Sequence, residues 1–203
     1  MAAPDPRSAL LVIDVQVGFC AGGNLAVPGG EDVVPGINAL MDDFRHVILT
    51  QDWHPAGHSS FASSHPGRAP YDVVEMPYGR QTLWPDHCVQ GTPDAAFAPG
   101  LDTRRARAVI RKGIDPAMDS YSAFFENDRV TPTGLEGYLR ALGVERVVMA
   151  GLALDFCVNF SALDAARLGF EVEVRTELSR AIDLQGSLKA ARGAMGSAGV
   201  ALR

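Results

Sequence analysis

The sequence has little of several features that mark special classes of protein. Three cysteines in 203 residues do not support a disulfide framework. The 18 Lys and Arg residues are scattered among 24 Asp and Glu, and the net charge of −6 gives no sign of a nucleic-acid partner. No apolar run is long enough to span a bilayer or to form a signal peptide. We therefore expect a cytoplasmic protein with free thiols and neither a nucleic-acid nor a membrane partner.

The composition is that of an ordinary globular protein. Hydrophobic residues make up 47% of the chain and charged residues 21%. The length suits one domain with a sizeable core. Residues 1–8 are polar and contain two prolines, so we expect a loose N-terminal arm at the start of a single domain that spans 1–203.

Short apolar runs alternate with stretches of helical spacing. Strands are predicted at Ala9–Val15, His46–Thr50, Ala108–Arg111, Arg146–Ala150, Phe170–Arg175 and Val200–Leu202. Helices are predicted at Val33–Arg45, at Gly134–Leu142 behind a Thr133/Glu136 capping box, at Phe156–Leu168 with Asp155 as N-cap, and at Ser187–Met195. Continuous β-branched strands that alternate with helices indicate a three-layer α/β/α fold around a mostly parallel sheet.

Two stretches interrupt this alternation. Residues 16–30 are rich in glycine, and residues 51–99 are long, irregular and rich in proline, glycine and histidine. A long irregular segment inside a compact domain usually carries function.

Chemically capable side chains follow four of the predicted strands. Asp14 ends the first strand, Asp52 and His54 follow the second, Lys112 follows the third, and Cys157 lies shortly after the fourth. In an open α/β sheet, ligands bind outside the carboxyl ends of the strands. We therefore expect these side chains to meet at one edge of the sheet.

Cys157 is expected in the first turn of its helix. Unpaired amides and the positive end of the helix dipole favour a thiolate there, and the same amides can bind an oxyanion. The alternative is a small buried hydrophobic side chain, which is the reading we prefer for Cys20 and Cys88.

Asp14 and Lys112 are candidate partners of that thiol. Asp14 can act as a general base, or it can be a turn residue bonded to the next loop. Lys112 can pair with Asp14 and stabilise a thiolate, or it can extend to solvent.

The histidine-rich segment suggests a metal site. Four of the five histidines lie between residues 51 and 87, and Asp52, His54, His58 and His87 are suitable ligands for Zn²⁺ or another first-row metal. Solvated loop histidines are the alternative. The aromatic residues Phe19, Trp53, Trp84 and Tyr121 can form a wall for a flat ring or simply pack the loops on the core.

Five segments together resemble the nicotinamidase branch of the isochorismatase-like hydrolase superfamily. They are LLVIDVQVGFC (10–20), TQDWHPAGHSSFA (50–62), QTLWPDHCVQGTP (81–93), RKGIDPAMDSYSAFF (111–125) and VVMAGLALDFCVNFSALDAARLGF (147–170). The resemblance covers almost the whole chain. It implies the α/β isochorismatase-like hydrolase fold.

The resemblance also implies roles for individual residues. The family's catalytic triad falls on Asp14, Lys112 and Cys157, and its metal ligands fall on Asp52, His54 and His87, with His58 matching an additional ligand of some members. Its substrate pocket maps to Phe19, Trp84, Tyr121 and Ala153. A cis peptide is expected at Ala153–Leu154, with the backbone amides of Leu154 and Cys157 facing the oxyanion. The family commonly has Thr where Leu154 stands, which puts one local hydrogen bond in doubt.

The implied reaction is hydrolysis of nicotinamide to nicotinate and ammonia through a Cys157 thioester, in NAD salvage, with pyrazinamide as a further substrate. One divalent metal, with zinc ahead of iron or manganese, would orient the ring. Two alternatives remain: another amide or isochorismate hydrolase of the superfamily, and a metal-binding protein without amidase activity. The sequence does not fix the oligomeric state, and a homo-oligomer is compatible with it.

Overall fold

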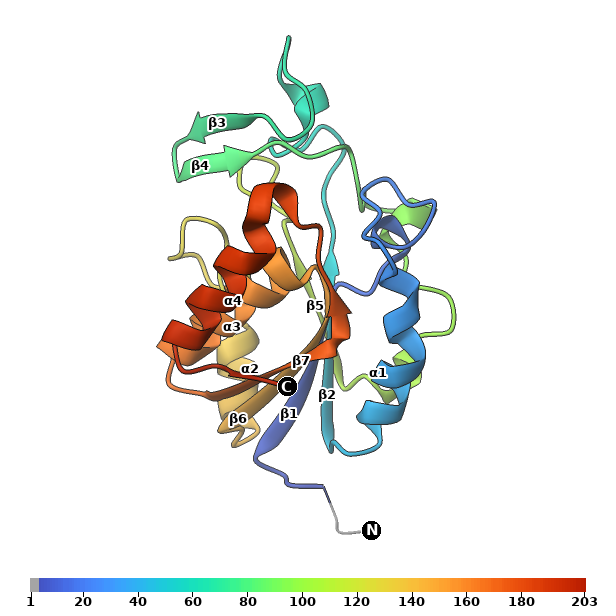
Figure 1. Cartoon of the computed structure of the whole chain (residues 1–203), viewed down its shortest axis with the longest axis vertical. Coiled ribbons are helices and arrows are strands. Elements are labelled where there is room, and N and C mark those ends of the chain that lie inside the picture. The colour runs from blue at the N-terminus through green and yellow to red at the C-terminus, as the bar shows by residue number, and fades with distance from the viewer. Residues whose placement is uncertain (1–3) are drawn as a thin grey trace.

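A computed structural model describes residues 4–203, and a six-stranded parallel sheet is at its centre (Figure 1). The strands are β1 (Ser8–Ile13), β2 (His46–Asp52), β5 (Ala108–Lys112), β6 (Arg146–Leu152), β7 (Glu171–Arg180) and β8 (Ala201–Leu202). Their order is β5-β2-β1-β6-β7-β8, and every neighbouring pair is parallel. The predicted α/β class with a mostly parallel sheet is therefore confirmed.

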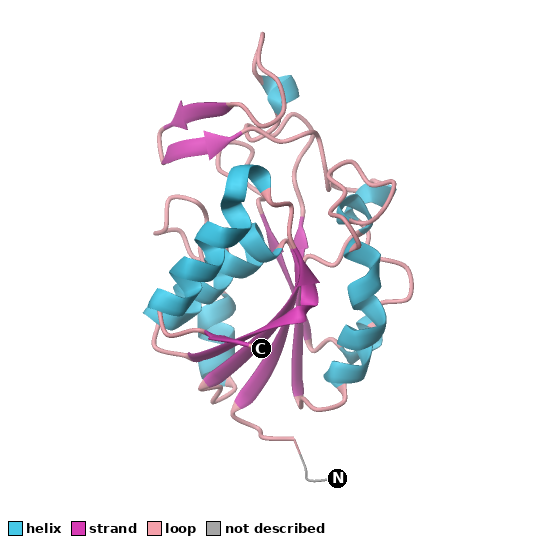
Figure 2. Ribbon diagram, viewed as in Figure 1, coloured by secondary structure: helices cyan, strands magenta, loops and turns pink. Residues whose placement is uncertain are grey.

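Helices cover both faces of this sheet (Figure 2). Helix α1 (Val34–Met41) lies on one face, and α2 (Leu135–Ala141), α3 (Asn159–Arg167) and α4 (Ser187–Ser197) lie on the other. Strand β1 shows why two layers are needed, since all six of its residues are buried. Leu10 and Val12 pack on the α1 side, while Leu11 and Ile13 pack on the opposite side.

A two-stranded antiparallel hairpin stands apart from the main sheet. It consists of β3 (Val73–Met76) and β4 (Gly79–Thr82), and it lies beyond the carboxyl ends of the sheet strands (Figure 1). The hairpin belongs to the long irregular segment between β2 and β5. Within residues 4–203, no helix is both long and apolar enough to cross a membrane.

Several element boundaries differ from the prediction. Strand β1 begins at Ser8 and ends at Ile13, because Asp14 turns out of the sheet with φ +46°. The N-terminal arm is therefore shorter than 1–8, and residues 1–3 lie outside the described part. Strand β2 continues to Asp52, so this carboxylate ends the strand rather than follows it. Strand β7 runs on to Arg180.

The two predicted N-caps are wrong. Thr133 does accept a hydrogen bond from the Leu135 amide (3.2 Å), but its own amide is bonded to the carbonyl of Phe124, so Glu136 cannot complete a capping box. The turn at Leu154–Val158 is a π-helical turn that begins after Ala153. Asp155 lies inside this turn, and its carboxylate binds the chain ahead of α4 instead.

Candidate active site

The topology brings the strand ends together. Asp52 and Lys112 are direct partners in the β2–β5 register, and Asp14 follows the next strand across the sheet, β1. Cys157 follows β6, the neighbour of β1 on its other side. The order β5-β2-β1-β6 therefore places these four side chains along one carboxyl edge, as the sequence predicted.

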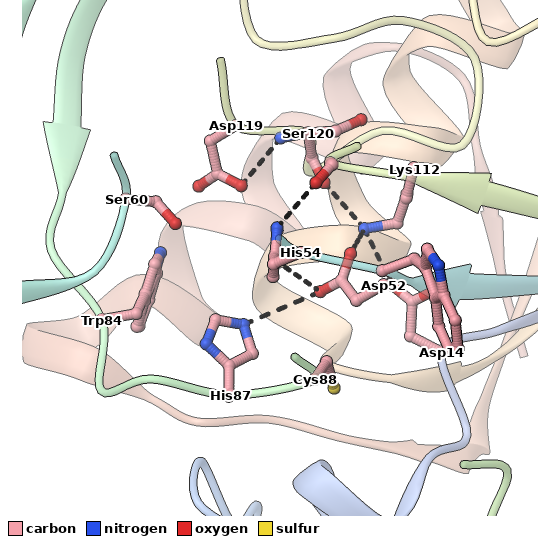
Figure 3. Close-up of polar contacts among 12 residues, drawn as sticks. Asp14, Asp52, His54, Ser60, Trp84, His87, Cys88, Lys112, Asp119 and Ser120 are labelled. Carbon is pink, nitrogen blue, oxygen red and sulfur yellow. Dashed lines mark hydrogen bonds and ion pairs between the residues drawn. The ribbon is translucent and has the colours of Figure 1, made fainter. Parts of the chain in front are cut away.

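Lys112 is completely buried and lies at the centre of this group (Figure 3). Its ammonium lies 3.0 Å from Asp14 Oδ2, donates to the carboxylate of Asp52 and to the carbonyl of Ser120 (2.7 Å), and lies 3.5 Å from Cys157 Sγ. Burial alone would lower the pKa of Lys112, but the two carboxylates raise it well above its ordinary value. The alternative in which Lys112 extends to solvent is excluded.

Asp14 is also buried, with one well-defined partner for each oxygen. Thr50 Oγ1 donates to Oδ1 (2.5 Å) and accepts from the Asp14 amide (3.0 Å), while Oδ2 faces Lys112. Burial raises the pKa of Asp14, as does Asp52, and Lys112 only partly offsets them. A carboxylate with a raised pKa is a stronger base, which suits proton exchange with a thiol.

Cys157 is buried in the π-helical turn. Burial raises the pKa of its thiol well above the ordinary value, the carboxylates of Asp14 and Asp52 raise it further, and Lys112 acts in the opposite direction. The resting group is therefore a thiol, not the thiolate expected from its place near a helix start. Polar atoms of Asp14, Asp52 and Cys157 lie within 4.8 Å of one another, so a base is within reach of the proton.

The cis peptide bond lies at Leu152–Ala153, one residue before the position implied by the resemblance. Strand β6 ends at Leu152, and the chain leaves the sheet there. The amides of Phe156 and Val158 both donate to the carbonyl of Ala153 at 3.1 Å. These two amides are engaged within the turn and are not available to bind an oxyanion.

Asp52, His54 and His87 form a group that could hold a metal ion. Both imidazole Nε2 atoms lie 3.8 Å from Asp52 Oδ2. The Nδ1 atoms contact carbonyls, of Gly113 at 3.0 Å for His54 and of Pro85 at 2.8 Å for His87. A carbonyl only accepts, so each Nδ1 carries a proton and each Nε2 faces the carboxylate. This tautomer is the one that binds a metal through Nε2.

His58 is not brought to Asp52. Its Nδ1 accepts from the amide of Ser60 (3.2 Å), and its Nε2 contacts the carbonyls of Asp115 (2.9 Å) and Met118 (3.2 Å). Its ring lies 4.4 Å from the ring of His54. Both ring nitrogens of His58 therefore form hydrogen bonds to protein groups. The Nε2 atoms of His54 and His87 instead face the carboxylate of Asp52 at 3.8 Å.

A small pocket opens onto these groups. The residues in its lining that the sequence predicted are Phe19, Trp84, Tyr121, Ala153, Asp52, His87 and Cys157. Trp84 Nε1 donates to the Tyr121 hydroxyl (3.0 Å), and Phe156 meets Trp84 edge-on, with ring centroids 4.9 Å apart. The lining is a fixed aromatic wall beside a thiol, which suits a small flat substrate.

Sequence reasoning left the role of Trp53 open and missed other residues. Trp53 is not part of the wall, because its ring packs under the guanidinium of Arg111 at 3.9 Å. The pocket also includes Leu25, Asp119, Phe156 and Ile182. The position of Phe156, next to Cys157, was a usable signal, whereas Leu25 and Ile182 come from loops without a pattern.

Gln16 was missed as well. Its side-chain amide accepts from the backbone amide of Asp52 (2.8 Å) and donates to the backbone carbonyl of the same residue (2.9 Å). A fully buried glutamine directly after a strand needs such partners, and this need was the available signal. Gln16 fixes the backbone of the residue shared by the lysine and the two histidines.

Known proteins resemble this chain over nearly its full length. A nicotinamidase of Acinetobacter baylyi is 50% identical over 192 residues, which cover 95% of this chain and 90% of the relative. A solved Acinetobacter baumanii nicotinamidase and pyrazinamidase superposes with a TM-score of 0.96 at 49% identity, covering 98% and 96% of the two chains.

Two further solved structures hold small ligands. PnC1 of L. infantum, in complex with nicotinate, has a TM-score of 0.86 at 41% identity and covers 100% of this chain and 95% of its own. A Pyrococcus horikoshii pyrazinamidase in complex with zinc has a TM-score of 0.78 at 33% identity, with coverages of 98% and 99%. The isochorismatase domain family matches residues 8–200. The chain therefore belongs to the isochorismatase family of hydrolases.

Proposed function

We propose that this chain is a nicotinamidase, an amidohydrolase that converts nicotinamide to nicotinate and ammonia in NAD salvage. The observation that carries the proposal is the convergence of Asp14, Lys112 and Cys157 beside an aromatic pocket whose lining also includes Asp52 and His87. The relatives at about half identity are nicotinamidases. Pyrazinamide, a ring of the same size with the same carboxamide, is a second substrate.

Cys157 is the nucleophile and Asp14 its base. Asp14 takes the thiol proton, the thiolate attacks the carboxamide carbon, and the proton passes to the leaving nitrogen so that ammonia departs and a thioester remains. Water, deprotonated by the same carboxylate, then cleaves the thioester to nicotinate. Lys112 holds Asp14 in place and stabilises the transient thiolate. The amides of Leu154 and Cys157 bind the oxyanion.

Asp52, His54 and His87 would hold one divalent transition metal, and zinc suits one carboxylate and two imidazoles. Iron and manganese accept the same donors. An ion bound there would supply a binding site for the pyridine nitrogen of the substrate. The hydrogen bonds to Gly113 and Pro85 hold both imidazoles in the tautomer that this requires. His58 is not needed as a ligand.

The remaining features fit a simple enzyme. A single domain carries the whole site, from Asp14 to Ile182. The three cysteines are free, which suits the reducing cytoplasm. Assembly into a homo-oligomer is compatible with the site, which draws all its groups from one chain.

An ammonia-release assay tests the proposal. The purified protein with its metal should release ammonia and nicotinate from nicotinamide in equal amounts, and Cys157→Ala should lower kcat/KM by at least about four orders of magnitude while retaining the metal. Full activity in Cys157→Ala would exclude the thioester route. A wild-type protein that binds metal but releases no ammonia would instead be a metal-binding protein of the same fold.

A further inference from the structure

Asp155 is a buried carboxylate that the mechanism does not use. It lies two residues before Cys157 in the same π-helical turn, and 3% of its surface is exposed. A buried charge needs compensation, because its desolvation is costly. The partners of Asp155 therefore indicate what it does.

All three partners lie between the end of β7 and the first residue of α4. Asp155 Oδ1 accepts from the amide of Ile182 (3.0 Å), and Oδ2 accepts from the amide of Asp183 (2.8 Å) and from the hydroxyl of Ser187 (2.5 Å). Hydrogen bonds to an ionised carboxylate are stronger than those between neutral groups. One side chain of the nucleophile turn thus binds three groups of a distant segment.

That segment adopts an unfavourable backbone conformation. Asp183 and Gln185, which are not glycines, have φ of +55° and +52°, and Gly186 follows with φ +86°. Side-chain-bearing residues rarely adopt this region and do so only where the surroundings impose it. The hydrogen bond from the amide of Asp183 to the carboxylate of Asp155 is a contact that helps to hold this conformation.

Ile182 connects this segment to the proposed substrate pocket. Its side chain lines the pocket and packs against the cluster that contains Phe19, Trp84 and Ala153. Ile182 enters the wall from outside the sheet, so its position depends on how its backbone is anchored. The amide of Ile182 is bonded to Asp155.

We infer that Asp155 is a positioning residue, which anchors Ile182 as one wall of the substrate pocket and so couples substrate binding to the turn that carries the nucleophile. The inference rests on the proposed amidase function. Asp155 makes no contact with the reacting atoms. Its loss should therefore weaken binding of the ring more than it slows the chemistry on bound substrate.

Four variants test this inference. Asp155→Asn keeps the size of the side chain but replaces one acceptor oxygen with an NH₂ group, which cannot accept the hydrogen bonds that Asp155 receives. Ile182→Ala removes the side chain that lines the pocket. Each should raise KM for nicotinamide by about tenfold, with kcat per active enzyme changed less than about threefold. The double variant should be no worse than Ile182→Ala alone, because Asp155 acts through Ile182. Ser187→Ala is the matched control, because it leaves both hydrogen bonds from the backbone amides to Asp155 in place. It should keep KM within about twofold.

Hydrogen exchange gives a readout that does not depend on activity. The amides of Ile182 and Asp183 should be protected in the wild type and should exchange at least about tenfold faster in Asp155→Asn, but not in Ser187→Ala. Protection without any amidase activity would support the anchor and reject the proposed function. Unprotected wild-type amides, or a lowered kcat with unchanged KM in Asp155→Asn, would overturn the inference. If Asp155→Asn does not fold, the kinetics of Asp155→Glu and the wild-type exchange pattern test the inference in its place.

Discussion

The site has two halves that are built differently. The proton-transfer group, Asp14, Lys112 and Cys157, contains two buried opposite charges that already satisfy each other at 3.0 Å. In the metal-binding group, Asp52, His54 and His87, both Nε2 atoms lie 3.8 Å from Asp52 Oδ2, which is too far for hydrogen bonds. The first group is complete as a protein structure, whereas the second has the donors for a cation.

Asp52 belongs to both halves. One carboxylate oxygen binds Lys112, and the other faces the two imidazoles. Burial would raise the pKa of Asp52, but the positive charge of Lys112 holds it well below its ordinary value. The comparison teaches that one carboxylate can join two neighbouring groups when its two oxygens point in different directions.

The largest effect is expected where the proton-transfer group is broken. Lys112→Met leaves the carboxylate of Asp14 buried without its counter-charge, which should lower the free energy of unfolding by about 3–5 kcal/mol. It should also lower kcat by about three orders of magnitude, because the thiolate loses its cation. Urea unfolding and steady-state kinetics measure the two effects. The metal content should not fall, and a loss of metal in this variant would mean that the halves are not separable.

The next largest effect is expected in the metal-binding group. His87→Ala removes one of three donors and should lower metal affinity by about 100-fold or more. Nicotinamide KM should rise with it, while Cys157 remains alkylatable by iodoacetamide. Metal analysis after dialysis measures the loss. His58→Gln is the control, because both His58 nitrogens bond to protein groups. Equal metal loss in His58→Gln would make His58 a ligand.

A smaller effect is expected in the wall that both halves share. Tyr121→Phe removes the acceptor of the Trp84 indole N–H and should cost about 1–2 kcal/mol of stability, with a KM increase of a few fold. Metal content and thiol reactivity should not change. Tyr71→Phe is a matched control, since its ring also packs on Trp84 but is 43% exposed. Thermal unfolding and nicotinamide kinetics compare the two variants. Equal effects would contradict a role for the hydrogen bond between Trp84 and the Tyr121 hydroxyl.

The smallest effect concerns His46, at the opposite end of β2 from Asp52. Burial lowers the pKa of His46, and the positive charge of Arg107 lowers it further. The folded state therefore disfavours the protonated ring, while the unfolded chain protonates near the ordinary value of 6.5. The contribution of His46 to the free energy of unfolding should be constant above pH 6.5 and should decline as the pH falls below it.

His46→Gln tests this pH dependence. The difference in Tm between about pH 7.5 and about pH 5 should be smaller in the variant than in the wild type. An unchanged slope would assign the acid sensitivity to other groups. The result separates an imidazole kept neutral by its surroundings from the imidazoles of the metal-binding group.

The sequence by itself determined the fold class and most of the site. The apolar runs indicated a parallel sheet, and residues at the ends of those runs gave Asp14, Asp52 and Lys112. These inferences are local, because burial on both faces requires continuous apolar strands, and polar residues at their ends belong to the ligand edge. The tertiary structure decided what depends on contacts between distant segments. It turned Asp155 from a helix cap into an anchor for Ile182, raised the pKa of Cys157 through burial and through two carboxylates from other strands, and engaged both nitrogens of His58. No pattern within one segment encodes such pairings, because they form only when the sheet brings the segments together.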